Sequence, residues 1–182
     1  SHRSTLSAPP GSRIPTGATS VLSLRVELVS AQATWSVLNG PGGMPRLRVY
    51  LDGEPSLVSA LRDALCGGVV GLMVQGATEA SWQGPFSQQP VQVGFADDEA
   101  LIDFDERSHP AYRLLTEYFA FPDKFNFVDI PVPVPPGVWQ ERGLTLHFML
   151  RGVRADSHES RLLDTVQAAH FALGCTPVVN LF

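Results

Sequence analysis

Hydrophobic and polar residues alternate in three stretches of the chain, and each alternation predicts a half-buried β-strand. Side chains of a strand point to opposite faces in turn, so every second residue is apolar where one face is buried. Residues 69–75 are predicted to form a further strand, which follows the alternating stretch at residues 47–51 and precedes the one at residues 144–150. The alternating apolar positions are Leu22, Leu24, Val26 and Leu28, then Leu47, Val49 and Leu51, and finally Leu144, Leu146, Phe148 and Leu150.

Apolar residues recur at helical spacing in three other stretches. Pro55 and Pro110 are well placed as the first residues of two helices, because the first turn leaves its N–H groups unpaired anyway. Gly67 or Gly68 can end the first helix with a left-handed cap. The third stretch is short, and we expect it to be helical or irregular. The apolar positions are Leu57, Val58, Leu61, Ala64 and Leu65, then Leu114, Leu115, Tyr118 and Phe119, and finally Leu162, Leu163, Val166 and Ala169.

These elements predict a mixed α+β fold in which short strands pack with two or three helices. The strand, helix and strand over residues 47–75 are compatible with one crossover unit, right-handed if its strands are parallel. Residues 76–90 are polar and rich in turn formers, and we expect Trp82 and Phe86 to pin that loop to the core. Residues 1–19 are rich in Ser, Pro, Gly and Thr, which predicts a flexible linker or a segment left by cloning. Residues 20–182 then form the domain.

The densest apolar segment is residues 112–129, which we call the aromatic corner. Four of the ten phenylalanines fall within nine of its positions, and Pro122 separates helical spacing before it from strand-like alternation after it. One interpretation is that the rings are all core, packed between helix and sheet. The other is that some rings emerge as an interface anchor, with Asp123 and Lys124 as its polar rim.

Composition and charge exclude several classes of protein. Apolar content of 44% and charged content of 17% indicate a folded chain. A net charge of −5 gives no electrostatic reason to expect nucleic acid or anionic lipid as a partner. No apolar run approaches the ~20 residues of a membrane span, so we expect no membrane insertion. Cys66 and Cys175 are too few for a disulfide framework, which favours a reducing cytoplasm, although one intramolecular pair is compatible with the sequence.

The acidic segment 97–106 is the best candidate for metal or acid–base chemistry, because hard cations prefer several oxygens from one loop. Asp103-Phe-Asp105 nevertheless lacks the third ligand and the glycine of a calcium loop. A solvated turn with acidic residues near a helix N-terminus explains the segment better. The six carboxylates are Asp97, Asp98, Glu99, Asp103, Asp105 and Glu106.

The other chemical candidates are weaker. His158-Glu159 would need a second histidine where Leu162 stands, so the zinc-helix motif fails. The glycines of residues 67–71 lie between a helix and a strand, the reverse of a dinucleotide loop. Cys175 precedes an extended apolar segment and is expected to be a small core residue. We therefore expect no enzyme, no metal and no cofactor.

Three motifs, in this order, resemble the TssF family (also called VasA or ImpG), the baseplate subunit of the type VI secretion system. Asp123, where Glu is more usual, and Asn126, where a bulkier apolar residue is expected, are small departures. The motifs are Val93-Gly-Phe-Ala-Asp-Asp-Glu-Ala-Leu101, Glu117-Tyr-Phe-Ala-Phe-Pro-Asp-Lys-Phe125 continuing to Asp129-Ile130, and Leu173-Gly-Cys-Thr-Pro-Val-Val-Asn-Leu-Phe182.

The resemblance implies a central fragment of a longer, non-enzymatic wedge protein on which the contractile tail tube and sheath assemble in the bacterial cytoplasm. It implies TssG, TssK, TssE and a VgrG-type spike as partners, and a baseplate docked at the inner-membrane complex. Two alternatives stay open: a phage-tail-like baseplate protein, and a metal- or ligand-binding domain using loop 97–106. The aromatic corner and the segment from Leu173 to Phe182 are expected to hold the fold, and an apolar edge left exposed would favour self-association. The candidate structural or interface residues are Tyr118, Phe119, Phe121, Pro122, Asp123, Lys124, Phe125, Phe127, Cys175, Thr176, Pro177 and Asn180.

Overall fold

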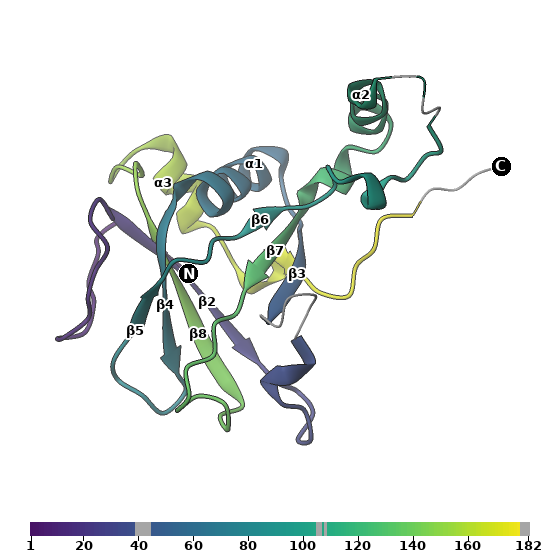
Figure 1. Ribbon diagram of the computed structural model, residues 1–182. Helices are drawn as coiled ribbons and strands as arrows, with labels where there is room; N and C mark the ends of the chain where they lie inside the picture. The colour runs from purple at the N-terminus through teal and green to yellow at the C-terminus, as the bar shows by residue number, and fades with distance from the viewer. Residues whose placement is uncertain (39–44, 105–106, 108, 179–182) are drawn as a thin grey trace.

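Two antiparallel sheets form the body of the molecule, as the computed structural model shows (Figure 1). The structure describes residues 1–38, 45–104, 107 and 109–178. The first sheet has the order β1-β2-β8-β4-β5 and the second the order β6-β7-β3-β9. The strands of the first sheet are β1 (His2–Arg3), β2 (Ser20–Glu27), β8 (Gly143–Leu150), β4 (Val69–Gly76) and β5 (Gln83–Phe86). Those of the second are β6 (Val91–Gln92), β7 (Phe127–Pro131), β3 (Arg46–Leu51) and β9 (Phe171–Ala172).

Three α-helices accompany the sheets in the described part of the chain. They are α1 (Pro55–Asp63), α2 (Pro110–Ala120) and α3 (His158–Asp164). Short helical turns fill the connections: η1 (Trp35–Leu38), η2 (Ala64–Gly68), η3 (Asp97–Glu99), η4 (Pro122–Asn126) and η5 (Ala168–His170). The predicted mixed α+β class is confirmed. No helix of the described residues is both long enough and apolar enough to span a bilayer.

The central strand β8 organises the core, because β2 and β4 pair with its two edges in antiparallel register. Its Leu146 lies opposite Leu24 on β2 and Val74 on β4. On one face these strands pack against α1 and the second sheet in a single apolar cluster. Trp35 is fully buried in this cluster, and its indole N–H donates to the carbonyl oxygen of Glu141 at 2.8 Å. β8 is buried on both faces: its alternate positions on the second face include the fully buried Met149 and the buried, polar His147.

The N-terminal segment is packed against the sheet, so the prediction of a flexible linker over residues 1–19 is wrong. His2 and Arg3 pair with β2, and Leu6, Ile14 and Ala18 cover the second face of the first sheet. That face carries the buried residues Val21, Met73 and Met149. The prediction failed because these few apolar side chains are spread among turn formers, and only the sheet surface gives them a common place to be buried.

The strand–helix–strand crossover does not form. β3 belongs to the second sheet and β4 to the first, so α1 connects two sheets instead of two parallel strands of one. The left-handed glycine cap is also absent at Gly67 and Gly68. Instead α1 runs directly into the wider turn η2, and the chain becomes extended at Val69. The expectation of a loop over residues 76–90 is wrong in part, because Gln83–Phe86 form the edge strand β5. Trp82 and Phe86 do pack against buried apolar clusters, as expected.

Helix α2 lies away from α1 and α3. In Figure 1 it projects from the body, beyond the ends of β6 and β7. We call residues 94–126, which join β6 to β7 and contain η3, α2 and η4, the α2 lobe. This lobe contains much of the aromatic corner, so its construction decides what the aromatic rings do.

Candidate functional site

Helix α2 buries its charged side and exposes its aromatic side. Arg113 is 4% exposed and Glu117 is fully buried, whereas Phe119 is 80% exposed. On an ordinary surface helix the apolar stripe faces the core. Here the exposed large apolar residues share the opposite side of the helix; they are Tyr112, Leu115, Tyr118 and Phe119, and we call them the α2 face.

A buried cluster of charges attaches α2 to its neighbours. The carboxylate of Glu117 accepts hydrogen bonds from the ammonium of Lys124 and from Arg113 Nη1, the latter at 3.4 Å. The amide of Leu101 donates to Glu117 Oε1 at 2.7 Å. Arg113 Nη2 reaches Asp97 Oδ1 at 3.0 Å on η3. The cluster therefore ties η3, the 101 loop and η4 to one side of the helix.

The surroundings of Glu117 keep its carboxylate charged. Burial alone would raise the pKa, but the hydrogen bonds from Lys124 and from the Leu101 amide, with the positive charges of Lys124 and Arg113, lower the pKa of this carboxyl from its ordinary value. A buried carboxylate is tolerable only when its oxygens are paired in this way. Glu117 is therefore a structural anchor of α2.

Some rings of the aromatic corner are buried and others are exposed. Phe125 and Phe127 are buried, with exposed fractions of 2% and 5%. Tyr118 bridges the two groups, because its ring centroid lies 5.6 Å from that of Phe119 and 5.8 Å from that of Phe125. Phe95 continues the row at 5.0 Å from Phe125. A connected strip of rings thus leads from the interior of the lobe to its surface.

Of the two residues expected at a polar rim, only one is exposed. Asp123 is exposed at the turn η4, next to the exposed Pro122, while Phe121 is half-buried. Lys124 is 3% exposed and points inward to Glu117, so its assignment to the rim is wrong. A lysine at a turn is normally solvated, and only the tertiary position of Glu117 provides the charge that draws it inside.

The closing segment runs beside the aromatic corner without being buried in it. β9 pairs with the end of β3, and residues 173–178 are then exposed. Cys175 is among them, so the prediction that it is a small core residue is wrong. Cys175 and Cys66 are both free thiols. Asn180 and the rest of the motif lie outside the described residues.

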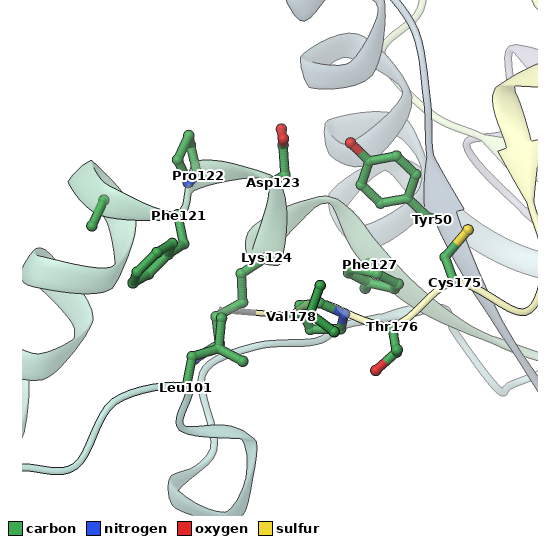
Figure 2. A pocket seen from close by; sticks show the side chains of 12 residues that line it. Tyr50, Leu101, Phe121, Pro122, Asp123, Lys124, Phe127, Cys175, Thr176 and Val178 are labelled. Carbon is green, nitrogen blue, oxygen red and sulfur yellow. The ribbon is translucent and has the colours of Figure 1, made fainter. Parts of the chain in front are cut away.

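The structure brings residues of all three motifs together around one pocket of about 360 Å³ (Figure 2). Its walls are mostly apolar, and its buried amine, Lys124, is already bound to Glu117. The pocket is therefore suited to binding apolar groups. The residues from the motifs that line it are Leu101, Ala120, Phe121, Pro122, Asp123, Lys124, Phe127, Cys175, Thr176, Pro177 and Val178.

The acidic loop has structural partners. Asp97 pairs with Arg113, and Glu99 Oε2 accepts from the amides of Gly94 at 2.7 Å and Ala96 at 3.2 Å. Arg48 approaches Glu99 Oε1 at 3.5 Å. Asp105 and Glu106 lie outside the described residues. Within residues 1–38, 45–104, 107 and 109–178, no three His, Cys, Asp or Glu side chains are grouped to hold a metal ion.

His147 is a packed histidine of the central strand. Its Nδ1 lies 2.8 Å from the Ser23 hydroxyl, its Nε2 lies 3.2 Å from Gln75 Oε1, and Trp82 stacks on the ring at 3.9 Å. Burial, with a smaller effect from the positive charge of Arg3, lowers its pKa to about 4. The ring is therefore neutral at pH 7 and serves as a hydrogen-bonding core residue.

Sequence reasoning missed the buried cluster, although a signal was available. Arg113 and Glu117 are four residues apart, as in a helical ion pair, and they are the charged residues of α2. What the pattern could not show is which side of the helix faces the body.

The family model described as "Type VI secretion system, TssF" matches residues 2–182. A curated relative, the type VI secretion system component TssF1 of Pseudomonas aeruginosa PAO1, is 31% identical over 137 residues, or 75% of this chain. The chain spans about a fifth of that relative, since the match covers 21% of its length.

A solved structure is similar as well. It is a cryo-electron microscopy structure of the type VI secretion system TssK-TssF-TssG baseplate subcomplex, in which one chain superposes with a TM-score of 0.67 at 26% identity. The superposition covers 90% of this chain and 29% of that one. The three motifs seen in the sequence are thus supported by a match along nearly the whole chain, and the chain belongs to the TssF family of type VI secretion system proteins.

Proposed function

We propose that this chain is a structural domain of a type VI secretion baseplate subunit, and that it works by binding other subunits of the baseplate wedge. The observation that carries the proposal is the match of 90% of the chain to part of a TssK-TssF-TssG subcomplex. TssG and TssK are accordingly the first partners to test. The match to TssF also favours the secretion system over a phage-tail particle.

A structural role without catalysis is supported by how the polar groups are used. The charged residues of the α2 lobe with the least exposure, Arg113, Glu117 and Lys124, satisfy one another. His147 is held by Ser23 and Gln75 inside the sheet. Side chains that are committed to packing and pairing in this way are not poised to transfer protons or attack a substrate.

Contacts with TssE and a VgrG-type spike, and docking of the baseplate at the inner-membrane complex in the cytoplasm, are finer proposals supported by the family resemblance. Physically, a wedge protein of this kind needs interfaces that are large enough to be specific and still able to rearrange. The exposed aromatic surface of the α2 lobe is the described region with the composition of such an interface.

Sheath assembly in the bacterium that encodes the chain tests the proposal. We expect deletion of the gene to abolish assembly of fluorescently labelled sheaths, and re-expression of the intact gene to restore it. Sheaths that still assemble after the deletion would contradict a baseplate role. As a check on the ligand-binding alternative, calorimetric titration of the purified chain with divalent cations is expected to show no heat of binding.

A further inference from the structure

The α2 face has no charge of its own. The charged residues of the helix, Arg113 and Glu117, are both buried beneath it. Its four large side chains are all more than half exposed. Side chains of this kind present roughly 400–600 Å² together, the range in which apolar patches on single proteins are often functional. Leaving this surface in water is unfavourable, so a partner that covers it gains free energy.

The face is also held in place before any partner arrives. The Glu117 carboxylate binds Lys124 on η4, Arg113 on the same helix and the Leu101 amide. Tyr118 is supported from below by the buried ring of Phe125 at 5.8 Å. A surface fixed in this way loses little conformational entropy on binding, which favours affinity.

The spacing of the face suits a helix as its occupant. Tyr112, Leu115 and Phe119 are three and four residues apart, and so form one ridge along α2. A ridge of this spacing packs into the groove of a second helix. Amphipathic helices commonly bind in this way, through an apolar stripe of the same period.

The exposed charge of the α2 lobe selects among possible helices. Asp97, Asp98, Asp103 and Asp123 are exposed in the described part of the α2 lobe, and Arg107 is exposed there as well. The other two cations of the lobe are turned inward. The exposed charge of the described lobe is therefore acidic overall, although Asp97 is paired with Arg113, and Asp123 lines one hollow together with Tyr118 of the face. A second copy of this chain would bring like charges together, which opposes a symmetric dimer, whereas lysine or arginine beside an apolar stripe would be attracted.

We propose that the α2 face is the docking surface for an amphipathic helix of another baseplate subunit, whose apolar stripe is flanked by lysine or arginine. The inference rests on the proposed function and adds to it the surface of contact and the chemistry of the partner. Phe119 is the central anchor, because it is the most exposed ring of the face. Asp123 belongs to the acidic surroundings that steer the partner.

The test is binding of the purified chain to the cognate TssG and TssK, each titrated separately and analysed by size-exclusion chromatography with light scattering. We expect one of them to bind, and Phe119→Asp to weaken that binding at least tenfold. Val29→Asp is the matched control, because Val29 is an equally apolar side chain, 94% exposed, outside the α2 lobe. Far-ultraviolet circular dichroism and melting curves should show both variants folded like the parent.

Charge is tested by Asp123→Lys, which should weaken binding at low salt and have a smaller effect at high salt. Glu159→Lys, at an exposed glutamate on α3, is the control and should bind like the parent.

The proposal is overturned if Phe119→Asp binds as well as Val29→Asp, or if neither subunit binds the parent chain. It is also overturned if the parent chain forms a dimer that Phe119→Asp abolishes, since the occupant would then be a second copy. None of these outcomes changes the sheath-assembly result, so the proposed function stands or falls separately.

Discussion

At the scale of single residues, buried charge attaches α2 to the molecule. Glu117 is fully buried, and Lys124 and Arg113 are 3% and 4% exposed. Removing these groups from water costs several kcal/mol each, and their mutual attraction offsets that cost only while all of the partners remain. The cluster is therefore sensitive to the loss of any one member.

Glu117→Gln keeps the shape of the side chain and removes its charge, which leaves Lys124 buried without its counter-ion and Arg113 with Asp97 alone. We expect the attachment of α2 to weaken by roughly 3–5 kcal/mol, measured as lost protection of α2 amides against hydrogen exchange. Unchanged protection would show that the cluster does not hold the helix. Glu27→Gln is the matched control, because it breaks the exposed Arg25–Glu27 pair and should cost about 1 kcal/mol or less in the free energy of unfolding.

A double variant, Glu117→Gln with Lys124→Met, separates charge from packing. Replacing both members of a buried ion pair with uncharged groups is often close to neutral. We therefore expect the double variant to regain most of the protection that Glu117→Gln loses.

His147 predicts a dependence of stability on pH. Its pKa is lowered to about 4 in the folded chain, while an unfolded histidine titrates near 6.5. Between about pH 4 and about pH 6.5, His147 is protonated in the unfolded chain and neutral in the folded chain. The contribution of His147 to the free energy of unfolding is therefore complete above about pH 6.5 and is lost as the pH falls toward 4. Urea unfolding should show about 3 kcal/mol less stability at about pH 4 than at about pH 7 from this group. His147→Gln should remove that part of the dependence, and parallel curves for the two proteins would contradict it.

At the scale of elements, α2 is an amphipathic helix that buries its charged side and exposes its apolar side. Its existence and its start at Pro110 follow from local pattern, and the structure places it at Pro110–Ala120. Its orientation does not follow, because an apolar stripe predicts burial only where a surface is available to cover it. In the described chain the polar side of α2 is the side with partners, which are Asp97, Lys124 and the Leu101 amide.

Two phenylalanines of the same segment test this orientation. Phe125→Ala should lower the free energy of unfolding by roughly 3–5 kcal/mol, because it leaves a cavity between Phe95 and Tyr118. Phe119→Ala should change it by about 0.5 kcal/mol or less, because that ring is exposed in the isolated chain. Thermal and urea unfolding followed by circular dichroism measure both. Similar large losses in the two variants would mean that Phe119 is buried after all.

At the scale of the whole molecule, the chain divides into a two-sheet body and a projecting lobe (Figure 1). The body is held by one large apolar cluster that spans both sheets and α1. The lobe is held by its ion cluster and by the rings of Phe95, Tyr118 and Phe125. Regions with fewer buried apolar contacts open at lower free energy than the core.

Hydrogen exchange of the parent chain should therefore distinguish the two parts. We expect amides of β8, paired on both edges, to exchange only by global unfolding, while amides of α2 exchange through a smaller opening. Binding of a partner to the α2 face should slow exchange in α2 and leave β8 unchanged. Equal protection in both elements would indicate a single cooperative unit.

Local pattern was sufficient for the strands around Leu24, Val49 and Leu146 and for the position of α1, because period and proline placement act over a few residues. The helical or irregular stretch expected from Leu162 to Ala169 overlaps only the end of α3. It also identified the family, since the three motifs are contiguous runs of sequence. Local pattern did not assign β3 and β4 to different sheets, because pairing partners are chosen by contacts far apart in the chain.

By itself, then, the sequence determined the four long strands β2, β3, β4 and β8, the helices α1 and α2, the mixed α+β class and membership of the TssF family. Only the tertiary structure decided that residues 1–19 cover a sheet, that Cys175 is exposed, that Lys124 is buried and that Phe119 faces solvent. The physical reason is common to all four. Burial depends on whether another part of the chain supplies a matching surface or counter-charge, and the type of residue alone does not determine this.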